Sequence, residues 1–243
     1  MHRILFVEPR PEALTGLALL VGRDCAVRTV PNMLEATRLG PRFRPDLLVV
    51  DVPKDGVERH SILFHLVTDF PKCPIIVITA DGRHDVLPDL AGLRLEGLFP
   101  KPVAIDKLVA CMVHAARLPR LVLHRSVAAA VEHIVARYAE HPTLRSVASA
   151  VSASRTHLAA RFRRDTGMTM MVFLARFRVE VAKALLRTTD DKLDAIASSI
   201  GFCDASHFSR VFQNTTRTRP GLYRRQASSP MDPCPFPRDS LEL

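Results

Sequence analysis

The feature that most constrains the fold is an alternation of short apolar runs with stretches of helical spacing over residues 1–118. The apolar runs are expected to be strands, at Ile4–Val7, Ala26–Val30, Leu47–Val50, Ile75–Thr79 and Gly97–Phe99. The stretches with helical spacing are 11–22, 32–39, 57–69, 82–91 and 103–117. Uninterrupted apolar runs such as LLVV and IIVI are typical of parallel strands that are covered on both faces. The sequence therefore predicts an α/β domain with a parallel, five-stranded sheet.

Polar side chains gather where these strands are expected to end. Glu8 follows the first run and Asp51 follows the third. Thr79 closes the fourth run, and Lys101 follows the fifth. Ligands of open parallel sheets bind at the carboxyl ends of the strands. Two carboxylates, a hydroxyl and a lysine at one edge favour an acidic pocket that handles an anion, although polar residues end the strands of many α/β domains.

These residues, with Pro102 directly after Lys101, resemble the site of the receiver domain of two-component response regulators. The resemblance implies a flavodoxin-like fold with strand order 2-1-3-4-5. It makes Asp51 the phospho-acceptor and places Glu8, Thr79 and Lys101 in the phosphoryl pocket. It also implies a Mg²⁺ ion at Glu8 and Asp51, and a sensor histidine kinase as a partner.

Three departures from the receiver pattern affect this pocket. Receivers carry two adjacent acids after the first strand, of which the second binds Mg²⁺ directly. Here the pair is Glu8-Pro9, and proline supplies no ligand. The loop VPKDG after Asp51 is shorter than usual, and Leu98 stands where receivers have an aromatic residue, with Phe99 one place later. We therefore expect a weakened Mg²⁺ site.

The sequence leaves two uses of this domain open. In one, a kinase phosphorylates Asp51, which repacks the face of the fourth helix and fifth strand and changes dimerisation. In the other, the domain is not phosphorylated and serves as a dimerisation or docking module, or as a sensor of a small molecule. An enzyme unrelated to DNA is disfavoured, because Glu8, Asp51 and Thr79 provide no set of nucleophile, base and orienting histidine.

Residues 193–225 have the pattern of two helices joined by a tight turn. The inner face of the first helix is formed by Leu193, Ile196, Ala197 and Ile200. Gly201 stands where a helix end favours a left-handed residue, and Asp204 is a suitable N-cap for the second helix. The outer face of that helix is polar and basic, with Ser206, Ser209, Arg210 and Gln213. This pattern indicates a helix-turn-helix that faces the major groove, or else an ordinary amphipathic hairpin.

The same stretch resembles the second half of the DNA-binding domain of the AraC/XylS family. The matching positions are Ile196-Ala197, Gly201-Phe202, Ser206, Phe208, Arg210, Phe212, Pro220, Tyr223 and Arg224. The resemblance covers residues 124–226 and implies a first helix-turn-helix at 144–163, for which Thr143 and Ser154 are suitable caps. The side chains expected to meet base edges or phosphates are Thr156, Ser206, Ser209, Arg210 and Gln213. Those expected to clamp the DNA backbone are Arg161, Arg163 and Arg164.

A single long helix is expected between the two units, at residues 171–187. Its inward positions are Phe173, Leu174, Phe177, Val181 and Leu185. About 17 residues at about 1.5 Å each give roughly 26 Å, a strut that can hold two recognition helices in successive turns of the major groove. A further helix, from about Val127 to Glu140, is either the first helix of this domain or part of a dimer-forming linker.

The positive charge lies almost entirely in the second half of the chain. Residues 1–120 hold 16 lysines and arginines against 14 aspartates and glutamates, whereas residues 124–226 hold 17 against 8. Nearly all of the excess is arginine, whose planar fork matches phosphate geometry. A basic module beside a nearly neutral one favours a nucleic-acid binder with an appended partner domain.

We therefore expect a receiver-like domain at 1–118, a linker at 119–126, an AraC-type domain at 127–226 and a disordered proline-rich tail at 227–243. The expected partners are double-stranded DNA, RNA polymerase and a second copy of the chain. No signal peptide or membrane span is expected, and five scattered cysteines indicate a reduced, cytoplasmic protein. The sequence as a whole predicts a transcription regulator and not an enzyme.

Overall fold

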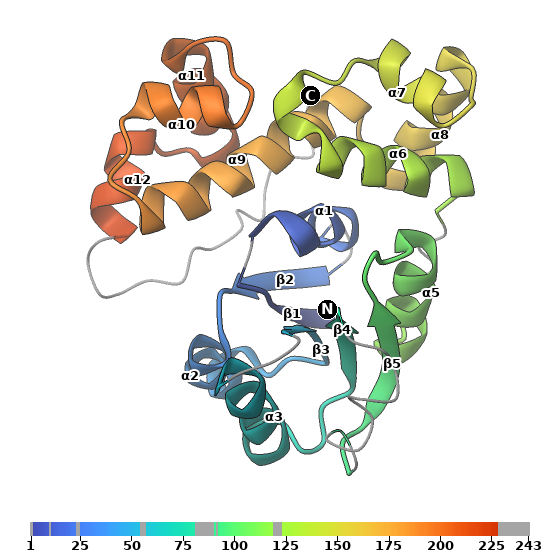
Figure 1. Ribbon diagram of the computed structural model, residues 1–243, viewed down its shortest axis with the longest axis vertical. Helices are drawn as coiled ribbons and strands as arrows, with labels where there is room; N and C mark the ends of the chain where they lie inside the picture. Colours follow the sequence, from blue (N-terminus) through green and yellow to red (C-terminus); the bar gives the residue numbers. More distant parts are fainter. Residues whose placement is uncertain are drawn as a thin grey trace.

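The first half of the chain folds around a parallel sheet. The computed structural model describes residues 2–9, 11–22, 25–53, 57–80, 90, 92–118 and 123–227, with backbone only at 11–13, 57–58 and 227. The strands are β1 (His2–Val7), β2 (Cys25–Val30), β3 (Leu47–Val52), β4 (Ile75–Thr79) and β5 (Leu95–Pro100). Their order is β2-β1-β3-β4-β5 and every pairing is parallel, as predicted (Figure 1).

Helices cover both faces of this sheet because its strands are apolar on both sides. The helices are α1 (Pro11–Val21), α2 (Met33–Phe43), α3 (Val57–Asp69) and α5 (Ile105–Ala115). Ile4 and Phe6 of β1 pack in one cluster with α1 and α5, whereas Leu5 and Val7 pack in another with α2 and α3. Leu98 packs in the cluster with α2 and α3, whereas Phe99 packs in the cluster with α1 and α5. The aromatic ring therefore lies on the α5 side of the sheet. The helix expected at 82–91 lies almost entirely outside the described residues.

Helix α2 continues past its predicted end at residue 39. It includes Pro41 and stops at Arg44, whose left-handed backbone N–H donates to the Gly40 carbonyl. Tertiary packing explains the extension, because Gly40 is buried and a Cβ atom there would lie 2.9 Å from the Phe70 ring. Close packing thus outweighs the poor helix propensity of glycine and proline in this turn.

The second half of the described chain is entirely helical. Its elements are α6 (Arg125–Ala136), the 3₁₀ turn Tyr138–Glu140, α7 (Leu144–Ala150), α8 (Arg155–Thr166), α9 (Met170–Thr188), α10 (Leu193–Ser199), α11 (Ala205–Thr216) and α12 (Pro220–Ala227). The single helix expected at 127–140 is wrong in its second part, since the α-helix ends at Ala136 and the 3₁₀ turn ends at a left-handed His141. Residues 228–243, where a disordered tail is expected, lie outside the described residues.

Local signals fix both helix-turn-helix units. The N-caps Thr143, Ser154 and Asp204 each accept the backbone N–H three residues on, at 3.1, 3.2 and 2.7 Å. The turns require left-handed backbone, with φ of 52° at Ser152 and 85° at Gly201. The predicted caps and turns are therefore confirmed, and glycine is replaced at one turn by a serine that accepts the same conformation.

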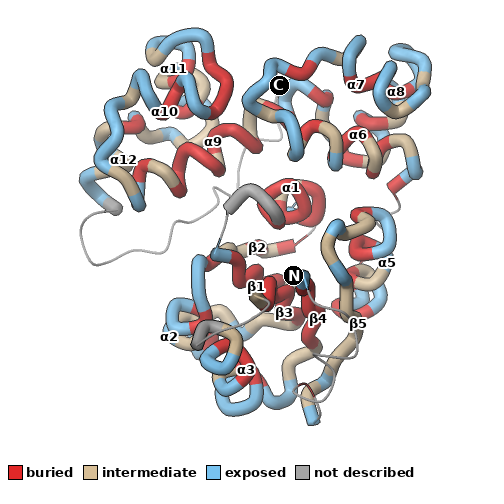
Figure 2. The backbone as a smooth tube through the Cα atoms, viewed as in Figure 1, coloured by how far each residue is buried: buried red, intermediate tan, exposed pale blue. Residues whose placement is uncertain are grey.

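Helix α9 joins the two units as one unbroken helix, as predicted, and it is largely buried (Figure 2). Phe173, Leu174, Phe177 and Val181 lie inward as expected. Leu185 packs against the core of the second unit but is only partly buried, and its neighbour Leu186 is the fully buried residue.

A buried arginine on α9 ties the second unit to the turn before the first. The Arg178 guanidinium donates to the Tyr138 carbonyl through Nε at 3.0 Å and Nη2 at 2.6 Å, and it lies 5.4 Å from the Phe202 ring centre. Burial lowers the pKa of Arg178 from its ordinary value. The sequence pattern does not reveal this role, because an arginine in a basic domain is expected at the surface.

Two further properties concern the described part of the chain only. None of its helices is both long and apolar enough to cross a membrane. Cys73, Cys111 and Cys203 do not form disulfides. Burial raises the pKa of Cys73 to about 12, so this side chain stays protonated at neutral pH.

Replacing Gly201 by alanine should destabilise the protein. The backbone there is left-handed, and an added Cβ would lie 2.8 Å from the Ala139 carbonyl oxygen and 2.6 Å from Arg178 Nη2. We expect the free energy of unfolding to fall by about 1–3 kcal/mol, measured by urea denaturation. The control is Gly221→Ala, where no atom lies within 4 Å of the added Cβ. Equal effects of the two substitutions would contradict this assignment.

Candidate nucleic-acid interface and receiver pocket

The sheet brings the four predicted pocket residues to its carboxyl edge. Glu8 directly follows β1, Asp51 lies in β3, Thr79 ends β4 and Lys101 directly follows β5. Lys101 Nζ donates to Asp51 Oδ2 at 2.5 Å, and its backbone N–H donates to the Thr79 carbonyl at 2.8 Å. Glu8, Asp51 and Thr79 are buried. The carboxyl edge of the sheet therefore holds an ion pair between the predicted phospho-acceptor and the predicted lysine.

The Glu8 carboxylate stabilises the start of α1. Both of its oxygens lie within hydrogen-bond distance of the Leu14 backbone N–H, at 2.9 and 2.8 Å. A negative charge is favourable there because the first N–H groups of a helix lack partners within the helix. The sequence contained a signal for this contact, an acid three residues before a helix that starts with Pro11. The resemblance places Glu8 in the phosphoryl pocket and at Mg²⁺, and it does not predict this contact with α1.

The outer faces of α8 and α11 are open. Thr156, Arg163 and Arg164 of α8 are exposed. Ser206, Arg210 and Gln213 of α11 are exposed as well, and Ser209 is half-buried. Both helices lie on the side of α6 and α9 that faces away from the sheet (Figure 1). The structure therefore places most of the predicted DNA-contacting side chains on one accessible side of the molecule.

Arg161 differs from the rest of this set. It is half-buried, and its Nε donates to Asp165 at 3.1 Å instead of extending toward solvent. The Asp165 side chain is 5% exposed and also accepts the His124 backbone N–H at 2.8 Å, so it joins α8 to the start of α6. Arg161 thus positions the first unit, and Arg163 and Arg164 remain as candidates for phosphate contact.

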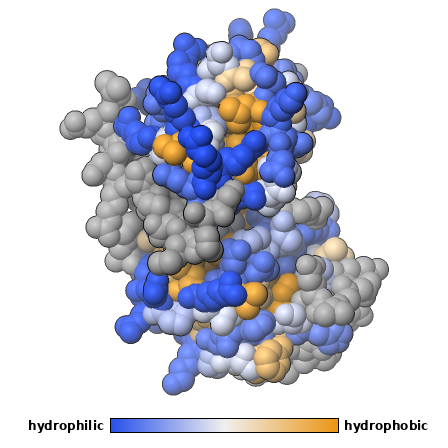
Figure 3. All heavy atoms as spheres, turned by 90° about the vertical axis from the view of Figure 1, so that its left-hand side faces the viewer, coloured by the Kyte–Doolittle hydropathy of each residue, from blue (hydrophilic) through white to orange (hydrophobic). Residues whose placement is uncertain are grey.

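A cationic cleft of about 540 Å³ opens between α11 and α12. Its lining residues are Leu193, Ser209, Arg210, Gln213, Asn214, Arg219, Pro220, Gly221, Leu222 and Arg225. It contains three guanidinium groups and no carboxylate, which suits a phosphate group. Hydrophilic side chains project from this upper part of the molecule (Figure 3). Arg219 and Arg225 are not among the predicted DNA-contacting residues, although the basic run around Pro220 is a usable signal for them.

Comparisons with known proteins agree with this arrangement. The family description "Response regulator receiver domain" matches residues 4–113, and "Helix-turn-helix domain" matches residues 147–226. The chain thus combines a response regulator receiver domain with an AraC-type helix-turn-helix domain. The fold and the order of the two domains are those predicted from the sequence.

Individual relatives match part of the chain. An uncharacterized HTH-type transcriptional regulator, YijO of Escherichia coli (strain K12), is 36% identical over 98 residues, which are 40% of this chain and 35% of that protein. The transcriptional activator NphR of Rhodococcus sp is 37% identical over 84 residues, which are 35% of this chain and 25% of that protein. The chain therefore spans about a third or less of the length of these relatives.

Among solved structures, the C-terminal domain of AraT, a response regulator from Geobacillus stearothermophilus, is 28% identical. The match covers 44% of this chain and 88% of that one, with a TM-score of 0.42.

Replacing Arg161 by alanine should lower the stability of the protein even when no DNA is present. The change leaves the Asp165 carboxylate, which is almost fully buried, without its closest guanidinium. We expect a loss of about 1–3 kcal/mol in the free energy of unfolding, measured by urea denaturation. The matched control on the same helix is Arg163→Ala, which removes an exposed side chain and should leave stability within about 0.5 kcal/mol. The assignment fails if Arg161→Ala unfolds like the wild-type protein.

Proposed function

We propose that the protein is a sequence-specific regulator of transcription that binds double-stranded DNA through α8 and α11. The observation that carries this proposal is the placement of two capped recognition helices, on the two units joined by α9, on one open side of the molecule. A helix-turn-helix presents its second helix to the major groove. A protein of this kind acts on promoter DNA in the cytoplasm, with RNA polymerase, and is not an enzyme.

The two units divide the work of recognition. On α11, Arg210 can donate two hydrogen bonds to guanine, and Ser206 and Gln213 can bond to base edges. On α8, Thr156 is flanked by Ala159 and Ala160, which offer only a methyl contact. We therefore assign base reading mainly to α11 and backbone contact mainly to Arg163 and Arg164 of α8.

The residues present do not fit a Mg²⁺ site of the usual receiver kind. The Glu8 carboxylate faces the Leu14 N–H, Asp51 is paired with Lys101, and Pro9 has no ligand atom. Mg²⁺ is usually held in proteins by one or two carboxylates together with phosphate and water, and both carboxylates here already have partners.

We therefore infer that Asp51 is phosphorylated slowly or not at all under ordinary Mg²⁺, and that the receiver serves mainly as a docking or dimerisation module. A sensor histidine kinase and a second copy of the chain remain proposed partners. The support for this inference is the Asp51–Lys101 ion pair and the contact of Glu8 with the start of α1.

Selection of bound fragments from random DNA tests the main proposal. The full chain should enrich a motif with two parts, because each unit contacts its own turn of the groove. Recovery of unenriched sequence at every round would contradict sequence-specific binding.

Binding should also depend steeply on salt. If the basic domain neutralises about six phosphates, a plot of the logarithm of the binding constant against the logarithm of the salt concentration should have a slope of about −5. Fluorescence anisotropy of a labelled duplex across a salt series measures this slope. A flat dependence would remove nucleic acid as the partner.

Arg210→Ala should weaken binding to the selected site by about 1–3 kcal/mol and relax its specificity at one base pair. Arg163→Ala is the matched control, since loss of a phosphate contact should weaken all sequences by a similar factor. The measurement is a competition titration with selected and random DNA. An equal loss on both DNAs for Arg210→Ala would show that α11 does not read this base.

Phosphorylation can be followed by intact mass after incubation of the full chain with a small phosphodonor and Mg²⁺. We expect slow or absent labelling of the wild-type chain. Pro9→Asp should increase labelling, because it restores the second acid after β1, and Asp51→Asn should abolish any labelling seen. Rapid, stoichiometric labelling of the wild-type chain at Asp51 would contradict the docking-module proposal.

A further inference from the structure

Helix α1 lacks the polar face expected of a surface helix. Its residues 14–21 read LTGLALLV, and within this stretch only Leu19 is not fully buried. A helix at the surface of a domain normally carries polar side chains on its solvent side, whereas one that is apolar all round is buried all round. The composition of α1 therefore requires a second partner in addition to the sheet.

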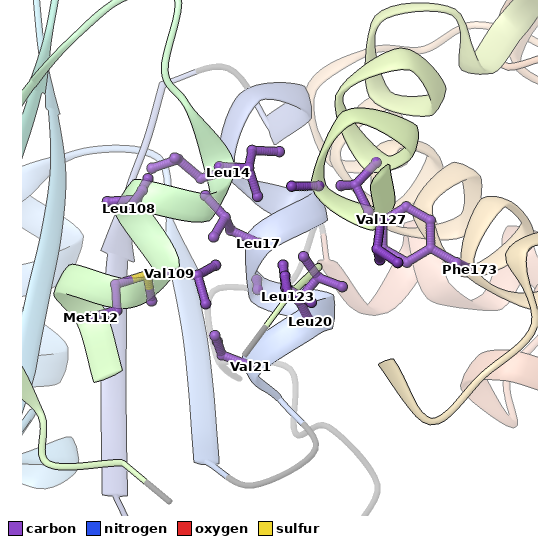
Figure 4. Packing of buried hydrophobic residues seen from close by; sticks show 14 of the residues in the cluster. Leu14, Leu17, Leu20, Val21, Leu108, Val109, Met112, Leu123, Val127 and Phe173 are labelled. Atoms are coloured by element: carbon purple, nitrogen blue, oxygen red, sulfur yellow. The ribbon is translucent and has the colours of Figure 1, made fainter. Parts of the chain in front are cut away.

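That partner is the DNA-binding domain of the same chain. A single apolar cluster runs from Ile4 of β1 through α1 to Val127 of α6 and Phe173 of α9. Figure 4 shows Leu14, Leu17 and Leu20 of α1 between α5 on one side and Val127 and Phe173 on the other. The two domains thus share one core.

The contact is close because α1 carries a glycine at its centre. A Cβ atom at Gly16 would lie 2.8 Å from Val135 Cγ2, and 3.8 Å from both the Phe173 and the Phe177 rings. Real Cβ atoms almost never approach a neighbour to 2.8 Å, so only glycine fits here without a shift. Glycine weakens a helix relative to alanine. Its presence in α1 is therefore explained by docking and not by the receiver fold alone.

The docking surface lies on α6, which precedes the first helix-turn-helix unit, and on α9, which connects the two units. Leu19 packs against the cluster that includes α7 and α8 and also against the cluster that includes α10 and α11. Val135 and Tyr138, which precede the first unit, join the same two clusters. Helix α1 therefore lies against the junction at which the relative position of the two units is set.

Two polar contacts connect this surface to the receiver pocket. Glu8 at the end of β1 holds the Leu14 N–H at the start of α1. On the other side of the pocket, the Ile105 N–H at the start of α5 donates to Glu132 Oε1 of α6 at 3.0 Å. Ile105 is four residues after Lys101, the partner of Asp51. Helix α1, which follows Glu8, and helix α5, which follows Lys101, thus both contact the DNA-binding domain.

We propose that α1 is the output surface of the receiver, and that its docking on α6 and α9 braces the two helix-turn-helix units in one relative arrangement. The docked receiver leaves α8 and α11 uncovered (Figure 1), so it acts by arranging the units and not by blocking them. This proposal rests on the proposed DNA-binding function for its consequence, but the docking itself can be tested without DNA.

The test uses full-length Gly16→Ala, Val135→Ala and the double variant. Alanine is the better helix former, so Gly16→Ala should harm the protein only through its collision with Val135 Cγ2. We expect trypsin to cleave between the domains, at Arg117 or Arg125, about tenfold faster in Gly16→Ala. Val135→Ala removes the colliding methyl group, so the double variant should return to within about threefold of Val135→Ala alone. Gly40→Ala, which collides with Phe70 inside the receiver, is the control and should leave this cleavage unchanged.

A second readout is affinity for the selected DNA site. Gly16→Ala should weaken it at least about threefold, because two units that are no longer held together bind with less preorganisation, and Val135→Ala should restore it. Unchanged cleavage in Gly16→Ala, or no rescue in the double variant, would overturn docking through α1. Altered cleavage with unaltered affinity would overturn α1 as an output surface. If no variant binds any DNA while the cleavage pattern holds, the proposed function fails and the docking stands.

Discussion

The arrangement of the whole molecule depends on the packing of aromatic rings along α9. Phe173 and Phe177 are stacked with ring centres 6.4 Å apart. Phe162 of the first unit meets Phe173 at 5.7 Å, and Tyr138 meets Phe177 at 5.2 Å. Gly16 of the receiver approaches both α9 rings. Because protein interiors are close-packed, a shift of any one of these elements must be met by the others. One helix therefore carries the positions of both units and of the receiver.

Much of the fold could be predicted from sequence because its signals are local. The β1–β5 pattern, the caps at Thr143, Ser154 and Asp204, and the left-handed Gly201 each depend on a few neighbouring residues. The continuation of α2 through Pro41 could not be predicted, because it depends on Phe70, which is distant in sequence. The deeper burial of Leu186 beside the partly buried Leu185 has a similar origin, because it depends on the elements that pack against α9.

In the candidate sites, too, features with local signals could be predicted from sequence and contacts with distant residues could not. Residue types at strand ends and on helix faces predicted the positions of Asp51, Thr79 and Arg210 well. Partners were not predictable, because they come from other elements: Leu14 for Glu8 and Asp165 for Arg161. These two contacts change the interpretation. They make Glu8 part of the connection to α1, and they give Arg161 a role in positioning α8.

The central claim is that one chain holds two recognition helices in a fixed arrangement on one side of a DNA duplex. Hydroxyl-radical footprinting of the full chain on its selected site tests this claim most directly. The account predicts two protected stretches on the same face of the duplex, centred about 10 base pairs apart, which is one helical turn. A single protected stretch for each bound chain, or two stretches on opposite faces of the duplex, would contradict it.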